Sequence, residues 1–251
     1  MQKFKSNGVE IAYEISGQGK PVLLIHGFAS SAHVNWRDTG WVKALTDAGY
    51  QVIAIDNRGH GESAKLYDKA LYSSPIMADD AKALLDHLGI GKIAVMGYSM
   101  GARISAFLTM NYPERVASAI FAGLAARMIT GVGGSEAIAE ALEAPSAADV
   151  TDRAARGFRL FADSTRSDRK ALAACIRSTR VKIKQEALAA IQAPVLVVAG
   201  ELDEVAGSVD GLTSVIPNSQ GAVLPKRNHM NAVGDAGYKA VVLAFLAEKY
   251  I

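Results

Sequence analysis

The stretch that decides the fold is IAVMGYSMGARISAFLTM, residues 93–110. Its first residues are apolar and typical of a buried strand, and helix-forming residues follow from position 102. Ser99 stands between Gly97 and Gly101 at the junction. A serine in so tight a strand-to-helix turn projects its hydroxyl from the top of the sheet, and any Cβ at the flanking positions would crowd the neighbouring strand and helix. The pattern predicts that Ser99 is a nucleophile.

A nucleophilic serine needs a general base, and the candidate is His229. The chain has five histidines, and only His229 follows Ser99. In architectures with this turn, the acid and then the histidine follow the serine along the chain. His229 lies in a polar loop before the last helical stretch. The alternative is a surface histidine without a catalytic task.

The acid is expected in a loop that follows a strand and precedes this histidine. Residues 193–200 are typical of a buried strand ended by glycine, and an acidic stretch follows. Asp203 is our candidate, with Glu201 and Glu204 as alternatives. A carboxylate here would hold the imidazole in the tautomer that accepts the serine proton, and would stabilise the imidazolium that results.

With these residues in place, the sequence resembles the α/β-hydrolase family over most of the chain outside a middle segment. Residues 22–28, VLLIHGF, resemble that family's third strand and the oxyanion loop after it. Residues 56–63, DNRGHGES, resemble its Asp-x-Arg-Gly-x-Gly-x-Ser segment. One departure is that the family often has a proline soon after the acid, whereas residues 204–207 here are EVAG.

The resemblance also implies roles for residues outside the predicted triad. The backbone N–H groups of Phe28 and Met100 would form an oxyanion hole. His26 would organise the backbone of the loop that carries Phe28. Asp56 and Arg58 would be a structural charged pair that helps to hold the loops around the serine turn.

The order of predicted elements indicates an α/β fold with a doubly wound, mostly parallel sheet. Asn7-Gly8 separates two short strand-like stretches and predicts a hairpin. Every candidate for the triad falls on a loop at the carboxyl end of a strand, where ligands bind in such sheets. Strands are expected at 21–25, 51–55, 92–96, 117–121, 195–199 and 220–224, and helices at about 41–48, 76–88, after Ser99, 205–215 and 235–249.

Residues 124–190 interrupt this alternation, because helical patterns rich in Ala and Arg replace the buried strands. By the resemblance, this segment is a cap of three or four small helices inserted into a core of residues 1–123 and 191–251. Its cations outnumber its acids between residues 150 and 180. They would either favour an anionic substrate or simply solvate the outer face of the cap. Candidates for the apolar pocket wall, or else for the cap's own core, are Leu124, Met128, Phe158, Leu160 and Phe161.

Composition excludes several classes of function. The chain of 251 residues has a formal charge of +2, close to neutral, which gives no argument for binding to nucleic acid or a membrane surface, since that would need a concentrated basic patch. Cys175 is the only cysteine, which fits a reducing cytoplasm. No leader-like or membrane-spanning apolar run is present. The histidine spacing predicts no metal site, and no glycine-rich phosphate loop predicts a nucleotide cofactor, so we expect none.

The sequence therefore predicts a cytoplasmic, cofactor-independent serine hydrolase, monomeric or homodimeric. A carboxylesterase that cleaves small to medium acyl esters is the first expectation. Relatives resembling epoxide hydrolases and haloalkane dehalogenases carry aspartate where Ser99 stands, so those activities are not expected. Lactonase, thioesterase, C–C hydrolase and perhydrolase or haloperoxidase activities remain open on the same triad. So do acyl transfer and a non-catalytic ligand receptor on the same fold.

Overall fold

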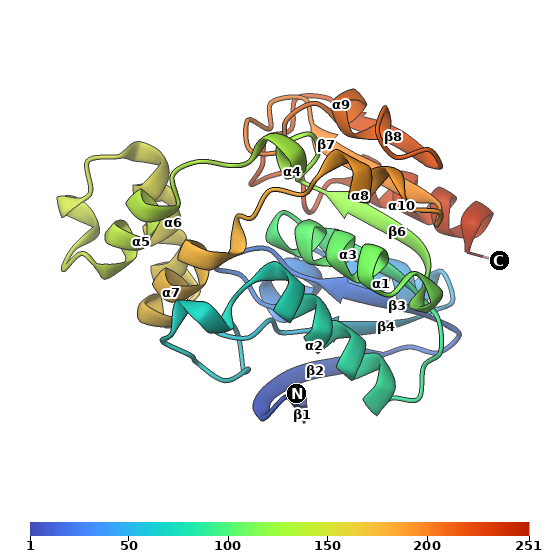
Figure 1. The fold of residues 1–251 in the computed structure, drawn as a ribbon, viewed down its shortest axis with the longest axis horizontal. Helices are drawn as coiled ribbons and strands as arrows, with labels where there is room; N and C mark the ends of the chain where they lie inside the picture. Colours follow the sequence, from blue (N-terminus) through green and yellow to red (C-terminus); the bar gives the residue numbers. More distant parts are fainter. Residues whose placement is uncertain (251) are drawn as a thin grey trace.

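A single eight-stranded sheet forms the centre of the computed structural model, which describes residues 1–250 (Figure 1). The strand order is β1-β2-β4-β3-β5-β6-β7-β8. The β1–β2 and β2–β4 pairs are antiparallel, and all the other pairs are parallel. The strands are β1 (Gln2–Ser6), β2 (Val9–Ser16), β3 (Lys20–Ile25), β4 (Tyr50–Ile55), β5 (Ile93–Tyr98), β6 (Val116–Ala122), β7 (Val195–Gly200) and β8 (Ser219–Leu224).

Helices cover both faces of the sheet, so the predicted doubly wound α/β fold is confirmed. In β3, Leu23 and Ile25 pack on the side of α2 and α3, whereas Val22 and Leu24 pack on the side of α1 and α10. This alternation follows from the two-residue period of a strand. The helices are α1 (Trp41–Asp47), α2 (Ser74–His87), α3 (Met100–Asn111), α4 (Arg127–Thr130), α5 (Ser135–Glu143), α6 (Arg153–Ser164), α7 (Arg169–Thr179), α8 (Gln185–Ala189), α9 (Val209–Thr213) and α10 (Ala236–Lys249).

The expected elements of the core are present with small shifts at their ends. Asn7 and Gly8 have φ values of 46° and 82°, as a tight hairpin turn with two left-handed residues requires. The helix expected at 205–215 is shorter, because α9 begins only at Val209, after the Ser208 side chain caps it. Residues 33–37 form a short wide-turn helix that the sequence pattern did not predict.

The segment between β6 and β7 holds five α-helices, α4 to α8, rather than the three or four expected. Figure 1 shows α5, α6 and α7 as a lobe that projects to one side of the sheet, while α4 and α8 lie against the main body. Asp152 and Asp168 cap the N-termini of α6 and α7 through their side chains. The division of the chain at residues 124 and 190 stays a prediction.

The register of the sheet brings the predicted functional loops together. Ile25 pairs with Gly97, so the loop after β3 lies beside the turn after β5. Gly200 pairs with Leu224, so the loops after β7 and β8 are also neighbours. Within residues 1–250, no helix is both long enough and apolar enough to cross a membrane.

Candidate active site

The turn at Ser99 has the strained geometry that its sequence predicts. Ser99 adopts φ 55° and ψ −111°, and its N–H donates to the carbonyl of Ala122 at 2.7 Å. A Cβ at Gly97 would collide with the carbonyl of Gly101, and a Cβ at Gly101 would collide with the carbonyl of Ile25. Glycine at both positions therefore lets β5, α3 and β3 approach one another closely enough to form the turn.

Ser99, His229 and Asp203 form one chain of hydrogen bonds. His229 Nε2 lies 3.0 Å from Ser99 Oγ. On the other side of the ring, His229 Nδ1 lies 2.9 Å from Asp203 Oδ2 and 3.0 Å from Oδ1. In the tautomer with the proton on Nδ1, the imidazole donates to the carboxylate and leaves Nε2 free to accept the serine proton.

Asp203 is fixed by its own loop, which has no proline. Its Oδ1 accepts hydrogen bonds from the N–H groups of Val205 and Ala206, each at 3.0 Å. Proline has no N–H, so a proline at 205 could not make this bond. With valine there, the carboxylate of Asp203 closes the turn by accepting from the backbone. The two alternative acids face elsewhere: Glu201 is exposed and accepts from the N–H of Lys226, and Glu204 is exposed. Asp203 is thus the carboxylate of this loop that contacts the imidazole.

The two amides expected to form an oxyanion hole border the same space as Ser99. Phe28 and Met100 line one cavity together with Ser99. Met100 is the first residue of α3, where backbone N–H groups have no partner within the helix. Within residues 1–250, neither amide donates to a protein acceptor. Both are therefore free to donate to an oxygen that develops negative charge.

His26 lies behind this loop and is buried. Its Nδ1 lies 2.7 Å from the carbonyl of Gly27, and its Nε2 accepts from the N–H of Asn57 at 3.0 Å. Burial lowers the pKa of His26 to about 4, so the ring is neutral at physiological pH. His26 joins the loops after β3 and β4, as an organiser of the loop backbone would.

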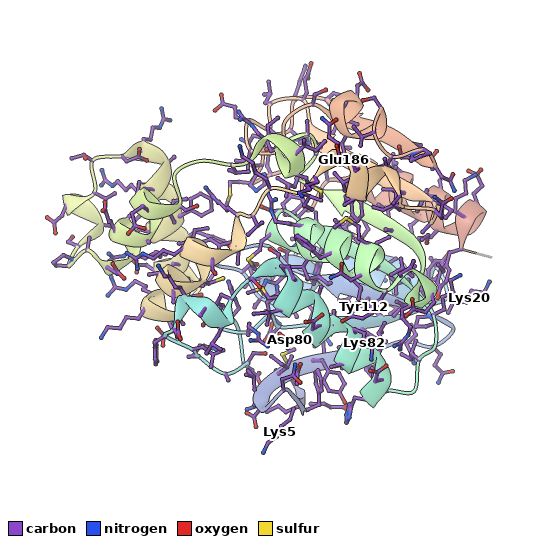
Figure 2. All side chains as sticks on the ribbon, viewed as in Figure 1. Lys5, Lys20, Asp80, Lys82, Tyr112 and Glu186 are labelled. Atoms are coloured by element: carbon purple, nitrogen blue, oxygen red, sulfur yellow. The ribbon has the colours of Figure 1, made fainter. Side chains whose placement is uncertain are left out.

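The expected charged pair between Asp56 and Arg58 is not formed. Asp56 instead accepts from the N–H groups of Ala32 and Glu62, at 2.7 and 2.8 Å. Arg58 forms a bidentate pair with Asp80, with both N···O distances 2.7 Å, and Asp80 projects from α2 (Figure 2). Both side chains hold the loop after β4, but through different partners, because the carboxylate of Asp56 is already occupied by backbone donors.

Tyr98 is a functional candidate that the sequence patterns did not single out. Its hydroxyl donates to the backbone carbonyl of His229 at 2.6 Å, and the two rings lie 5.5 Å apart. Tyr98 occupies the variable position directly before the serine, and its side chain therefore sits at the carboxyl end of β5. The signal in the sequence that could have found Tyr98 is its position directly before Ser99, at the end of a strand whose neighbouring loops carry the predicted triad.

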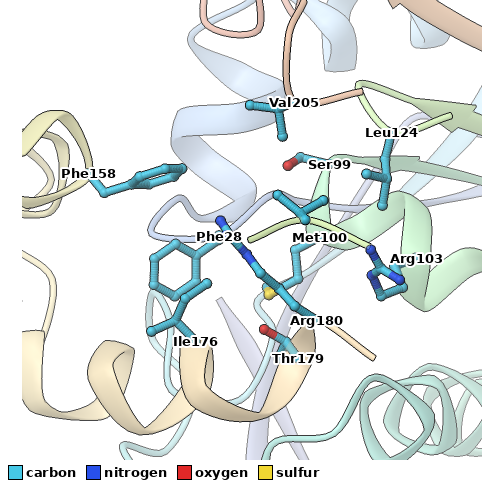
Figure 3. Close-up of a pocket in the computed structure, with 11 residues that line it drawn as sticks. Phe28, Ser99, Met100, Arg103, Leu124, Phe158, Ile176, Thr179, Arg180 and Val205 are labelled. Atoms are coloured by element: carbon cyan, nitrogen blue, oxygen red, sulfur yellow. The ribbon is translucent and has the colours of Figure 1, made fainter. Parts of the chain in front are cut away.

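Two cavities meet at Ser99, and both are lined by Phe28 and Phe158. The first has a volume of about 410 Å³, including space open to solvent (Figure 3). The second has a volume of about 750 Å³, including space open to solvent. The first is also lined by Met100, Arg103, Leu124, Val132, Ile176, Thr179, Arg180 and Val205. The second is also lined by Gly27, Ser30, Val34, Asn35, Thr39, Tyr98, Phe161, His229, Met230 and Val233.

Three of the five residues expected in the pocket wall line these cavities, and two do not. Leu124, Phe158 and Phe161 line these cavities. Met128 does not, because its side chain is completely buried in the core beneath α4. Leu160 is 52% exposed and does not line either cavity. It lies on the solvent-facing side of α6, whereas its neighbours Arg159 and Phe161 are buried or half-buried. Among residues 1–250, no group of His, Cys, Asp and Glu side chains could hold a metal ion.

Comparisons with known proteins agree with this architecture. A model described as the alpha/beta hydrolase fold matches residues 20–180. A non-heme chloroperoxidase from Kitasatospora aureofaciens is 37% identical over 115 residues, which cover 45% of this chain and 40% of that protein's length.

Two solved structures resemble the whole chain. One is an esterase from Thermogutta terrifontis with malate bound, with 25% identity, 100% of each chain covered and a TM-score of 0.79. The other is a bromoperoxidase from Bacillus anthracis, with 28% identity, 95% of this chain and 96% of that chain covered, and a TM-score of 0.78. The strand order, the serine turn and the family match lead to one conclusion: the chain belongs to the α/β-hydrolase fold family.

Proposed function

We propose that this hydrolase is a carboxylesterase that uses Ser99 as nucleophile, His229 as general base and acid, and Asp203 as the orienting acid. The observation that carries the proposal is the continuous chain of hydrogen bonds from Asp203 through His229 to Ser99 Oγ. The free amides of Phe28 and Met100 beside Ser99 support it, because an acyl transfer needs donors for the developing oxyanion.

The chemistry follows from these positions. Ser99 Oγ attacks the ester carbonyl carbon while His229 Nε2 accepts the hydroxyl proton, and the amides of Phe28 and Met100 donate to the oxyanion. The tetrahedral intermediate then collapses, and His229 returns the proton to the leaving alkoxide. Water repeats the sequence on the acyl-enzyme, releases the carboxylic acid and restores the serine hydroxyl.

A second candidate is perhydrolysis, in which hydrogen peroxide replaces water in the second step and releases a peroxy acid. Two relatives carry peroxidase names, the chloroperoxidase and the bromoperoxidase described above. The first step and the acyl-enzyme are shared with the esterase reaction. Product analysis with and without peroxide therefore separates the two activities on one protein.

A panel of p-nitrophenyl esters of increasing acyl length, run beside a lactone and a thioester panel, tests the proposal. We expect ester hydrolysis and covalent labelling by a fluorophosphonate. Ser99→Ala should remove the labelling and lower turnover by about 10⁴- to 10⁶-fold. Ser164→Ala is the matched control, because Ser164 is exposed at the end of α6. A wild-type protein that neither turns over any panel nor reacts with the probe would be a ligand receptor instead.

The predicted cytoplasmic location stays part of the proposal.

A further inference from the structure

Two arginines line the first cavity beside Ser99, and the proposed mechanism uses neither. Arg103 lies on α3, one helical turn after Ser99, so both residues share a face of the helix. Arg180 follows the last residue of α7 and comes from the projecting lobe. Figure 3 shows both guanidinium groups among the residues that border this cavity.

Neither arginine has an acidic partner within residues 1–250. Arg103 is only 2% exposed and donates to the backbone carbonyls of Arg127, Met128 and Val181. Arg180 donates to the carbonyl of Gly133. Other arginines of the lobe are in ion pairs: Arg159 pairs with Asp163, and Arg177 pairs with two glutamates. Arg153, Arg156 and Arg166 form no ion pair within residues 1–250 either, but all three are exposed. Arg103 and Arg180 differ from these in lacking a counter-charge at a buried or half-buried position beside the cavity.

Burial of unpaired charge is unfavourable, and these two groups carry that cost. Burial lowers the pKa of Arg103 and that of Arg180 to about 10, and the charge of Arg180 contributes to the lowering at Arg103. Both groups remain protonated at neutral pH. The Arg180 guanidinium carbon also lies 6.0 Å from the centre of the Phe158 ring. The cavity is therefore cationic and lined mainly by apolar side chains, an environment in which an anion would be held strongly.

The position of His229 shows which part of an ester would enter this cavity. His229 lines the second cavity and not the first. Because His229 must deliver its proton to the leaving oxygen, the alcohol lies on the side of the second cavity, which is lined by Phe161, Met230 and Val233. The acyl group stays attached to Ser99 and extends into the first cavity, toward Arg103 and Arg180.

We propose that Arg103 and Arg180 bind a carboxylate at the far end of the acyl chain, so that the substrates are monoesters of short dicarboxylic acids with an apolar alcohol. This assignment rests on the proposed esterase function and adds its substrate class. A guanidinium presents paired N–H donors that match both oxygens of a carboxylate. The apolar second cavity takes the alcohol without a charged partner.

The test compares three esters. Monobenzyl glutarate carries the carboxylate on the acyl side, benzyl pentanoate is its neutral match in acyl length, and 5-(phenylacetyloxy)pentanoate carries the carboxylate on the alcohol side. We expect wild-type kcat/KM for monobenzyl glutarate to exceed that for benzyl pentanoate by about 10-fold or more. The third ester should be the poorest of the three, since its charge would enter the apolar cavity.

Variants identify the groups responsible. Arg180→Gln and Arg103→Gln should each lower the ratio of kcat/KM for monobenzyl glutarate to that for benzyl pentanoate by roughly 10- to 100-fold, which is the range for the loss of one charge-assisted hydrogen bond. The change should be mainly in KM. Arg156→Gln is the control, because Arg156 is an exposed arginine of α6 outside both cavities. It should keep the wild-type ratio. Arg180 is only partly buried, so its variant is informative even if Arg103→Gln fails to fold.

Binding provides a readout that does not need turnover. By calorimetry, Ser99→Ala protein should bind intact monobenzyl glutarate, and the added Arg180→Gln change should weaken that binding by about 10-fold or more. The substrate class would be overturned if the ratio of kcat/KM for monobenzyl glutarate to that for benzyl pentanoate were equal in Arg180→Gln and Arg156→Gln. A wild-type ratio of one or less would also overturn it. In either case, hydrolysis of benzyl pentanoate would leave the esterase proposal standing. A preference for the third ester would overturn the acyl side. If no ester is cleaved, the proposed function fails. If Ser99→Ala protein also does not bind monobenzyl glutarate, the carboxylate site is overturned as well.

Discussion

The hydroxyl of Tyr98 donates a 2.6 Å hydrogen bond to the backbone carbonyl of His229. This bond joins the end of β5, directly before the nucleophile, to the loop after β8 that carries the base. Asp203 orients the ring of His229 from one side, and Tyr98 holds its backbone from another. Tyr98 is therefore a positioning residue for the catalytic histidine of the proposed mechanism.

Replacing Tyr98 by Phe should lower kcat by about threefold to tenfold with little change in KM, because one hydrogen bond contributes about 0.5–1.5 kcal/mol net. Steady-state kinetics on a p-nitrophenyl ester measures this change. Tyr238→Phe is the matched control: its ring lies 6.4 Å from that of Tyr98, and its buried hydroxyl has no partner within residues 1–250. Equal kcat values for the two variants would remove Tyr98 from its positioning role.

Asp203→Asn should leave a folded protein whose turnover is lower by up to roughly 10⁴-fold, because the amide no longer favours the correct imidazole tautomer or stabilises the imidazolium. Glu201→Gln and Glu204→Gln should have far smaller effects, since both carboxylates are exposed. Turnover with a good ester substrate compares the three variants. Were Glu201→Gln or Glu204→Gln the most impaired, the acid would be misassigned. Similar activity in all three would mean that His229 is oriented from another part of the chain.

The buried histidines should make the protein less stable in mild acid. Burial lowers the pKa of His26 to about 4 and that of His60 to about 3, and the neighbouring His26 adds to the lowering at His60. Below a pH of about 6.5, the unfolded chain binds protons at these positions, whereas the folded protein does not until the pH approaches about 4. Stability present at neutral pH is therefore lost as the pH falls through this window.

Urea unfolding at pH 7 and pH 5 measures that loss, which we expect to be roughly 1–2 kcal/mol for each buried histidine. His60→Asn should reduce the difference between the two pH values, whatever it does to stability at pH 7. His33→Gln should not, because His33 is exposed. A wild-type difference that survives unchanged in His60→Asn would contradict this account.

Asp80→Asn should destabilise the protein strongly, because it leaves Arg58 buried without its carboxylate partner. Both side chains are 3% exposed. Loss of one partner of a buried pair costs about 3–5 kcal/mol, whereas an exposed pair contributes about 0–1 kcal/mol. Asp47→Asn, which breaks the exposed pair with Lys43, is the control. Denaturant midpoints measure both changes, and similar values would show that the Arg58–Asp80 pair contributes little.

Local sequence patterns were sufficient for the core of the fold, because strand and helix periods are short-range properties. The turn at Ser99 and the hairpin at Asn7 depend on one or two glycines, whose steric role is visible in the sequence. The choice of Asp203 followed from its place after β7. These elements needed no knowledge of distant contacts.

Long-range contacts limited the rest. Arg58 finds its partner 22 residues away on α2, so the nearer Asp56 was the wrong expectation. Arg180 is one of many cations in the lobe, and only the end of α7 decides that it faces the cavity. Helices α5, α6 and α7 each have a clear apolar face, but this periodicity does not show which helix or cavity that face contacts.

Phe158 is the residue of the lobe that borders both cavities, and its ring packs edge-on against Phe28 at 5.9 Å. The lobe also contacts the core elsewhere: the Ser74 hydroxyl donates to the carbonyl of Thr179, and the Thr165 hydroxyl lies 3.2 Å from the carbonyl of Ala29. None of Ser99, Asp203 and His229 lies on α5 to α7, so a sequence change in these helices leaves the residues of the proposed triad in place. A chimera that receives these helices from a relative should therefore keep the triad of the proposed mechanism, while Phe158 and the other cavity walls that the lobe contributes are replaced.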